Sequence, residues 1–175
     1  MTPGESLRAT GLVFVSALLQ ATFVSTLFVF GGTPDLLLIV VVSIGLLRGS
    51  VPGAVFGFAG GVVVDLLTLD TLGITSLVLT LAGFWAGRYG ETTGRGRALA
   101  PLFAVGVITV LAGVFGFTLH YMLGEEVVAR HALVTALLPA LVLNLILAIP
   151  VYRLVRRIIG RTGLLEPAPE VELVV

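Results

Sequence analysis

The 175-residue sequence contains no cysteine and no lysine. The absence of cysteine excludes disulfide bonds, thiol nucleophiles and cysteine-ligated metal sites. All ten basic residues are arginines, and ten acidic residues balance them, so the bulk charge does not indicate a nucleic-acid partner. Charged residues make up only 11% of the chain, whereas ordinary soluble domains carry about 25%.

Recognisable catalytic motifs are also missing. The chain has neither a Gly-x-Ser-x-Gly nor a His-Glu-x-x-His motif, which removes the commonest hydrolase signatures. Its two histidines, His120 and His131, flank one loop near the ends of apolar segments, where each is expected to bond to a nearby acid. A catalytic or zinc role for them is the alternative. We therefore expect no enzyme activity, no cofactor and no metal site.

The apolar residues that dominate the chain instead predict an integral membrane protein. They make up 57% of the sequence, and the mean hydropathy is +1.13. Apolar segments long enough to cross a bilayer predict an all-α polytopic bundle of six transmembrane helices in a single domain, residues 1–161. The expected spans are about 7–30, 34–47, 53–69, 74–89, 99–123 and 132–152. Residues 162–175 are expected to form a disordered cytoplasmic tail.

The positions of the arginines predict the orientation of these spans. If the N-terminus lies in the cytoplasm, only Arg130 of the ten arginines falls on the outer side. The positive-inside rule therefore predicts that both termini are cytoplasmic. Five arginines close to span ends are expected to contact lipid headgroups or to fix the topology. These are Arg48, Arg153, Arg156, Arg157 and Arg161.

The third expected span carries small residues at a spacing of four. Gly53, Gly57, Gly61 and Asp65 fall at successive i+4 positions, so on a helix they form one slowly turning edge. In a membrane such an edge lets another helix approach closely. An acid inside a span is costly unless it faces protein or water, so Asp65 is expected to point into the bundle. The glycines serve packing alone or packing plus a partner, and Asp65 is either structural or a partner contact.

Four more positions in the spans stand out. Gly83 and Gly87 repeat the spacing of four in the fourth span. Asp35 follows Pro34 and is expected in the first turn of the second span, where the helix dipole favours a carboxylate. Gln20 and Asn144 are polar groups inside spans, and each is expected to bond to a neighbouring helix.

The order of these motifs resembles the MreD family of rod shape-determining membrane proteins. The resemblance is carried by Thr33-Pro34-Asp35-Leu36-Leu37-Leu38, Arg48, the glycine edge ending in Asp65-Leu66-Leu67, Leu72-Gly73, and the Gly83/Gly87 span. It covers residues 33–90, and the rest of the chain matches in hydropathy. The family is itself similar in size and helix number to the substrate-binding subunits of energy-coupling-factor vitamin transporters, which supply the alternative function.

The resemblance implies a non-enzymatic subunit of the bacterial cell-elongation machinery in the inner membrane. Its implied partners are a single-span protein resembling MreC, the RodA and penicillin-binding synthase pair, and MreB filaments. From the residues themselves we expect the glycine edges, with Asp35 and Asp65 at their outer end, to receive the partner's helix. A vitamin carrier would instead need a wet outer pocket, and the outer loops offer few aromatic or polar groups to form one.

Overall fold

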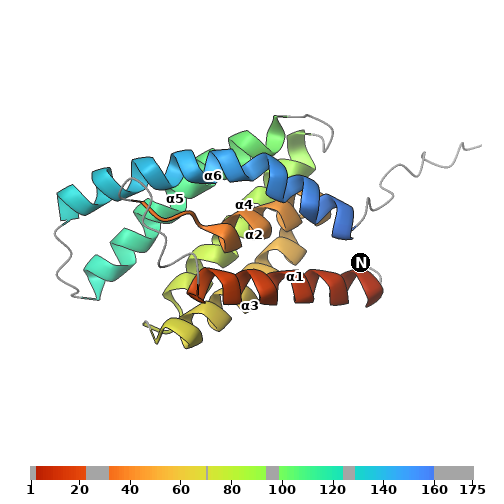
Figure 1. Cartoon of the computed structure of the whole chain (residues 1–175), viewed down its shortest axis with the longest axis horizontal. Helices are drawn as coiled ribbons and strands as arrows, with labels where there is room; N and C mark the ends of the chain where they lie inside the picture. Colours follow the sequence, from red (N-terminus) through yellow and green to blue (C-terminus); the bar gives the residue numbers. More distant parts are fainter. Residues whose placement is uncertain (1–2, 23–31, 70, 94–98, 124–128, 160–175) are drawn as a thin grey trace, which may run out of the picture.

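The computed structural model describes residues 3–22, 32–69, 71–93, 99–123 and 129–159, and for residues 93 and 129–136 it describes the backbone alone. These residues form six helices, which confirms the expected all-α fold (Figure 1). The helices are α1 (Pro3–Thr22), α2 (Leu36–Arg48), α3 (Ser50–Thr68), α4 (Ile74–Thr93), α5 (Ala100–Met122) and α6 (Ala129–Ile159). Residues 23–30 of the expected first span and the expected C-terminal tail lie outside the described residues.

The short helix α2 forms the centre of the bundle. It packs against each of the five other helices, and every residue from Leu37 to Leu46 is buried. A helix that is apolar on all sides can be enclosed by protein or by lipid. Here the other helices enclose it, which fits the run of leucine, isoleucine and valine without a polar face. At 13 residues, α2 is roughly 20 Å long.

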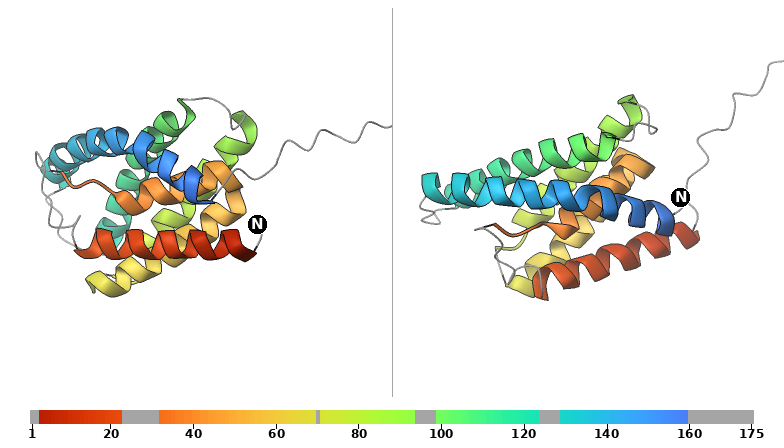
Figure 2. Two further views of the ribbon diagram at one scale, coloured as in Figure 1. Left: turned by 45° about the vertical axis from the view of Figure 1, so that its right-hand side comes forward. Right: turned by 45° about the horizontal axis from the view of Figure 1, so that its top comes forward.

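The other helices surround α2 in two groups. Figure 2 shows α1 and α3 on one side of the bundle and α5 and α6 on the other, with α2 and α4 between them. Most contacts agree with this arrangement, because α4 packs against α2, α3 and α5, while α1 packs against α2 and α3. A smaller contact joins α1 to α6. The expected third span, α3, is therefore a flank of the bundle and α2 is its core.

Two helices extend well beyond the spans expected from hydropathy. The fourth was expected to end at residue 89, but α4 continues to Thr93. The sixth was expected over residues 132–152, but α6 runs from Ala129 to Ile159 and contains Pro139 and Pro150. Hydropathy locates only the apolar middle of a helix, and the polar turns at its ends continue the same backbone hydrogen bonds.

The start of α2 also differs from the expectation. Asp35 is the N-cap residue of α2, with its Oδ1 accepting a hydrogen bond of 2.9 Å from the backbone N–H of Leu38. Pro34 therefore precedes the cap and does not lie in the first helical turn. A carboxylate at an N-cap satisfies one of the four backbone N–H groups that have no partner within the helix.

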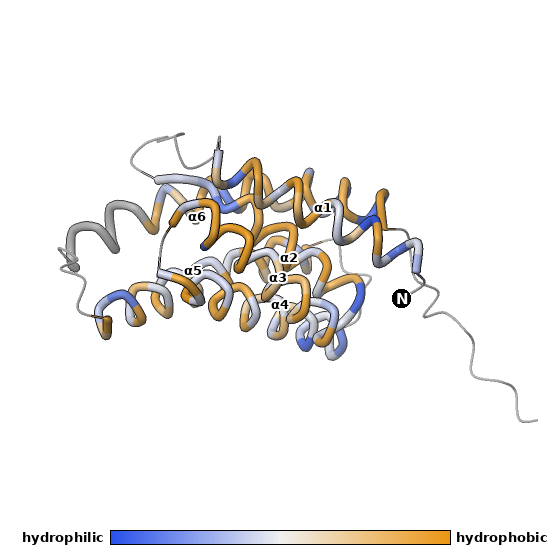
Figure 3. Tube along the Cα trace, turned by 90° about the horizontal axis from the view of Figure 1, so that it is seen from below, coloured by the Kyte–Doolittle hydropathy of each residue, from blue (hydrophilic) through white to orange (hydrophobic). Residues whose placement is uncertain are grey.

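Three helical segments are long and apolar enough to cross a membrane: Ser50–Thr68, Ala100–Met122 and Leu137–Ile159. The shorter apolar helix Leu36–Arg48 is enclosed by the others. In Figure 3 the helices are largely orange, and most of the hydrophilic segments lie near helix ends. This distribution is that of a membrane protein, because polar residues are least costly where helices approach the bilayer surface.

Candidate partner-docking site

The glycine edge of α3 lies directly against the backbone of α4. A Cβ atom added at Gly57 would come closer than 3.0 Å to the carbonyl oxygen of Leu79, and one at Gly61 would meet the backbone of Ser76 at similarly short range. Gly53 faces Gly83 in the same way. The two helices run antiparallel, because Gly53 near the start of α3 faces Gly83, whereas Gly61 farther along α3 faces Ser76 near the start of α4. Missing side chains thus allow the two helices to touch backbone to backbone, as the spacing of four predicts.

A second glycine contact joins α4 to α2 and to the start of α3. A Cβ atom at Gly45 of α2 would come closer than 3.0 Å to the carbonyl oxygen of Gly83, and one at Gly87 would meet the backbone of Ser50. Gly90 faces the backbone of Leu46. The small residues of α4 therefore accept two neighbouring helices at once.

These contacts change the expected role of the glycine edges. The helix packing predicted for Gly53, Gly57, Gly61, Gly83 and Gly87 is observed, but the helix that covers the edge of α3 is the chain's own α4. A partner helix has no room at this edge, because even one methyl group there would overlap backbone atoms.

Asp65 lies at the end of α3 and caps the start of α4. Its side chain is fully buried, and Oδ2 accepts hydrogen bonds from the backbone N–H groups of Gly73 at 2.8 Å and Ser76 at 3.4 Å. The helix dipole favours a carboxylate at this position. The expectation that Asp65 points into the bundle is confirmed, and its described bonding serves the α3–α4 hairpin.

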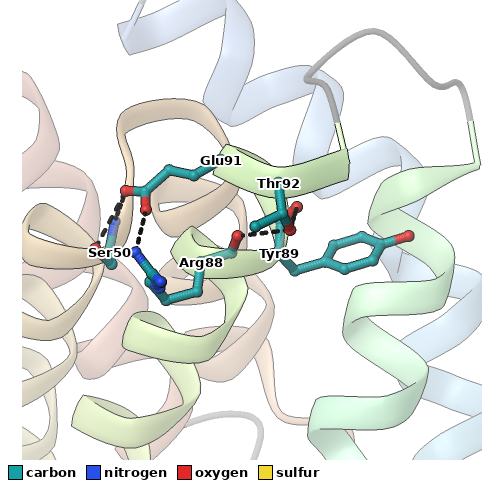
Figure 4. Close-up of polar contacts among 5 residues, drawn as sticks. All are labelled: Ser50, Arg88, Tyr89, Glu91 and Thr92. Carbon is teal, nitrogen blue, oxygen red and sulfur yellow. Dashed lines mark hydrogen bonds and ion pairs between the residues drawn. The ribbon is translucent and has the colours of Figure 1, made fainter.

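Glu91 performs the same task at the opposite end of the hairpin. Its Oε1 accepts hydrogen bonds from the backbone N–H of Ser50 at 2.8 Å and from the Ser50 hydroxyl at 3.1 Å (Figure 4). Its Oε2 lies 3.5 Å from Arg88. The N-cap position of α3 is Gly49, which has no side chain to cap the helix. Each of the two helices therefore supplies the carboxylate that caps the start of the other.

A polar cluster built by three helices holds the start of α2. The Gln20 side chain accepts from the N–H of Leu36 at 2.9 Å and donates to the carbonyl of Pro34 at 3.3 Å. The buried Asn144 side chain accepts from the N–H of Asp35 at 2.7 Å and donates to the Thr109 hydroxyl at 3.1 Å. These bonds replace water for a helix start enclosed in the bundle.

This cluster confirms that Gln20 and Asn144 bond to neighbouring segments. The role of Thr109 has no signal in the sequence, because a hydroxyl within an apolar span usually bonds to its own helix. Asp35 and Asp65 cap different helices and share no partner among these hydrogen bonds.

Arg48 differs most from its expected role. Its side chain is 1% exposed and forms an ion pair of 2.9 Å with Glu5 of α1. Its Nη2 donates a hydrogen bond of 2.6 Å to the carbonyl of Ile159, the last residue of α6. Arg48 therefore ties together α1, α2 and α6, and the expectation that it reaches lipid headgroups is wrong. Hydropathy gave no signal for this burial, because the partners lie 43 and 111 residues away in the sequence.

The remaining arginines singled out from the sequence lie at the end of α6. Arg153 and Arg157 are exposed and Arg156 is partly exposed, while Arg161 lies outside the described residues. His120 is partly buried, and the His131 side chain is not described. Among the described residues no three histidines, aspartates or glutamates gather as metal ligands would.

Two apolar grooves remain open on the surface of α5. One, of about 190 Å³, lies against α4 and is lined by Trp85, Ile108 and Phe115, among others. The other, of about 550 Å³, lies between α5 and α6. Its lining residues are Leu102, Phe103, Gly106, Val107, Val110, Leu111, Leu141 and Leu145. Both grooves suit apolar occupants such as a helix or an acyl chain.

Comparison with known proteins identifies a family. The family model described as rod shape-determining protein MreD matches residues 6–160, which covers most of the chain. No curated protein and no solved structure gives a significant match. The match includes all six helices except the first residues of α1.

Proposed function

Because the chain belongs to the MreD family of rod shape-determining membrane proteins, we propose that it is a non-enzymatic subunit of the bacterial cell-elongation complex in the inner membrane. Its task in this proposal is to dock a single-span partner resembling MreC. The family match over residues 6–160 is the observation that carries the proposal. Through this partner the chain would join the RodA and penicillin-binding synthase pair and the MreB filaments.

In this proposal the six helices cross the membrane alternately, with both termini in the cytoplasm. The antiparallel contact between α3 and α4 supports alternate crossing. The arginines support the orientation, because Arg8 lies near the start of α1, Arg88 near the end of α4 and three arginines near the end of α6, whereas only Arg130 lies at the start of α6. With this alternation, those three ends share one side of the membrane, the side that the positive-inside rule assigns to the cytoplasm.

The groove between α5 and α6 is the surface that best suits the partner's helix. Its lining is almost entirely apolar, and Gly106 lies within it. A Cβ atom at Gly106 would meet only a side-chain atom of Leu145, at 3.3 Å, so the partner's backbone can approach here without an obstructing side chain. Close approach of this kind drives association between helices in lipid. The glycines of α3 and α4 contribute indirectly by keeping the rest of the bundle rigid.

The open grooves support docking over vitamin binding. A carrier for a polar vitamin needs several polar groups converging on the ligand. The linings of both described grooves contain only apolar side chains and glycine, apart from the indole N–H of Trp85.

Co-purification of the partner tests the proposal. Gly106→Leu fills the groove with a side chain and should reduce recovery of a co-expressed MreC-like protein at least about tenfold, equivalent to about 1.4 kcal/mol. Gly11→Leu is the matched control, because Gly11 lies on α1 with no atom within 4 Å of an added Cβ. Both variants should insert, and their melting temperatures in detergent must be compared with that of the parent, because a Cβ at Gly106 already meets the Leu145 side chain at 3.3 Å. Equal recovery from the two variants would contradict docking at this groove.

A further inference from the structure

One face of α6 changes from apolar to cationic along its length. Val142, Ile146, Ile149, Arg153 and Arg157 follow one another at spacings of three or four, so they lie along the same side of the helix. All five are exposed, with exposed fractions of 55% for Val142 and 65% for Ile146. The opposite side, which includes Asn144, Ala148 and Val155, is buried in the bundle. We call the five exposed residues the α6 stripe.

The two arginines of the stripe have no acidic neighbour within the described part of the chain. The ion pairs found among the described residues join Arg48 to Glu5 and Arg88 to Glu91. Glu91 is further engaged by the start of α3. Among the described residues, Glu5 and Glu91 are the acids engaged at this end of the bundle, both in contacts within the bundle, and no described acid pairs with the guanidinium groups of Arg153 and Arg157.

We propose that the α6 stripe binds an anionic phospholipid of the leaflet bordering this end of the bundle. The phosphate lies between Arg153 and Arg157, which are one helical turn apart, and an acyl chain lies along Ile149, Ile146 and Val142. Guanidinium groups bind phosphate oxygens through paired, charge-assisted hydrogen bonds. The order along the helix, cationic at its end and apolar towards its middle, matches the order of headgroup and acyl chain in a lipid.

The side chains of the stripe favour lipid over a partner's helix. Tight helix packing in membranes uses small residues that let backbones approach. The stripe contains two isoleucines and a valine at its apolar positions and no glycine, alanine or serine. A flexible acyl chain can pack against these branched side chains. A partner's helix would be kept at a distance by them, so its backbone could not approach the backbone of α6 closely. This assignment is independent of the proposed docking groove, which uses Leu141 and Leu145 of α6.

Binding of defined lipids to the purified full-length protein tests the assignment. Native mass spectrometry would compare phosphatidylglycerol with phosphatidylcholine at equal concentrations in the same detergent. Removing two arginines near a lipid surface should weaken binding about 30-fold, at roughly fivefold per residue. Arg153→Gln/Arg157→Gln should therefore lose phosphatidylglycerol, while phosphatidylcholine binding stays weak and unchanged.

The control removes the same charge from the same end of the bundle. Arg8→Gln/Arg88→Gln changes two exposed arginines of α1 and α4 and should reduce phosphatidylglycerol binding no more than about threefold. Arg153→Lys/Arg157→Lys keeps the charge and should restore part of the binding. Equal losses in the two glutamine variants, or no preference for phosphatidylglycerol in the parent, would overturn the proposal. The proposal would also be overturned if Arg153→Gln/Arg157→Gln kept phosphatidylglycerol but lost an acidic protein that co-purifies with the parent.

Discussion

A single methyl group added at Gly57 tests the contact between α3 and α4. The Cβ atom of Gly57→Ala would lie closer than 3.0 Å to backbone atoms of Leu79. Backbone atoms cannot rotate away as the end of a flexible side chain can, so the two helices must separate. The separation also loosens the neighbouring contacts at Gly53 and Gly61, because all three glycines belong to one edge.

Two opposing terms set the size of this effect. Overpacking of a close contact costs about 1–3 kcal/mol. Replacing glycine by alanine inside a helix returns up to about 1 kcal/mol, because alanine has the higher helix propensity. Gly11→Ala on α1 experiences the second term alone, since an added Cβ there meets nothing within 4 Å. The difference between the two variants therefore isolates the overpacking term, about 1–3 kcal/mol.

Thermal unfolding of both variants in one detergent gives this difference. For a chain of this size, about 1 kcal/mol shifts Tm by roughly 2–4 °C, so Gly57→Ala should melt roughly 2–12 °C below Gly11→Ala. Gly57→Leu should be more severe and prevent a stable fold, not merely weaken binding of a partner. If Gly57→Ala and Gly11→Ala melt at the same temperature, the close contact between α3 and α4 does not exist.

Substitutions at three further positions test the polar contacts of the bundle. Arg48→Leu should lower the free energy of unfolding by about 3 kcal/mol, because it removes both the ion pair with Glu5 and the hydrogen bond to the Ile159 carbonyl. Asn144→Leu should cost about 1–3 kcal/mol, since it removes the acceptor for a buried N–H at the start of α2. Glu91→Gln keeps an acceptor for Ser50 and should cost less than about 1 kcal/mol, whereas Glu91→Leu should cost about 1–3 kcal/mol. Unfolding curves of the parent and of each variant in one detergent check these values. Equal losses for the two Glu91 variants would contradict the capping role.

The sequence was sufficient to predict the features that repeat along one helix. The spacing of four at Gly53, Gly57 and Gly61 predicted close packing against another helix, and the contact with α4 confirms it. Gln20 and Asn144 were predicted to bond outside their own helices because an unpaired amide within a membrane span is costly. Both rules depend only on local spacing and residue type.

Features that depend on pairing between distant segments could not be predicted in this way. Glu91 caps α3 because the antiparallel packing places the end of α4 beside Ser50. Arg48 is buried because α1 and α6 converge on the end of α2. A charged residue next to an apolar run looks the same in sequence whether it faces headgroups or a buried carboxylate.

The expectation for the partner's groove was wrong for a related reason. A glycine edge indicates that some helix lies against it, but not whether that helix belongs to the same chain. Here α4 is only a short turn away from α3 in the sequence and occupies the edge. The groove at α5 and α6 has one glycine and no repeating pattern of small residues, so spacing alone did not identify it.

Crosslinking from two matched positions tests the docking claim most directly. Val107 lies in the α5–α6 groove and Phe58 on the open face of α3, and both are 57% exposed. Because the chain has no cysteine of its own, a cysteine at either position is the only thiol available to a partner with one cysteine in its span. A disulfide crosslink to the MreC-like partner should form from Val107→Cys and not from Phe58→Cys. A crosslink from Phe58→Cys alone, or from both to the same extent, would contradict docking at this groove.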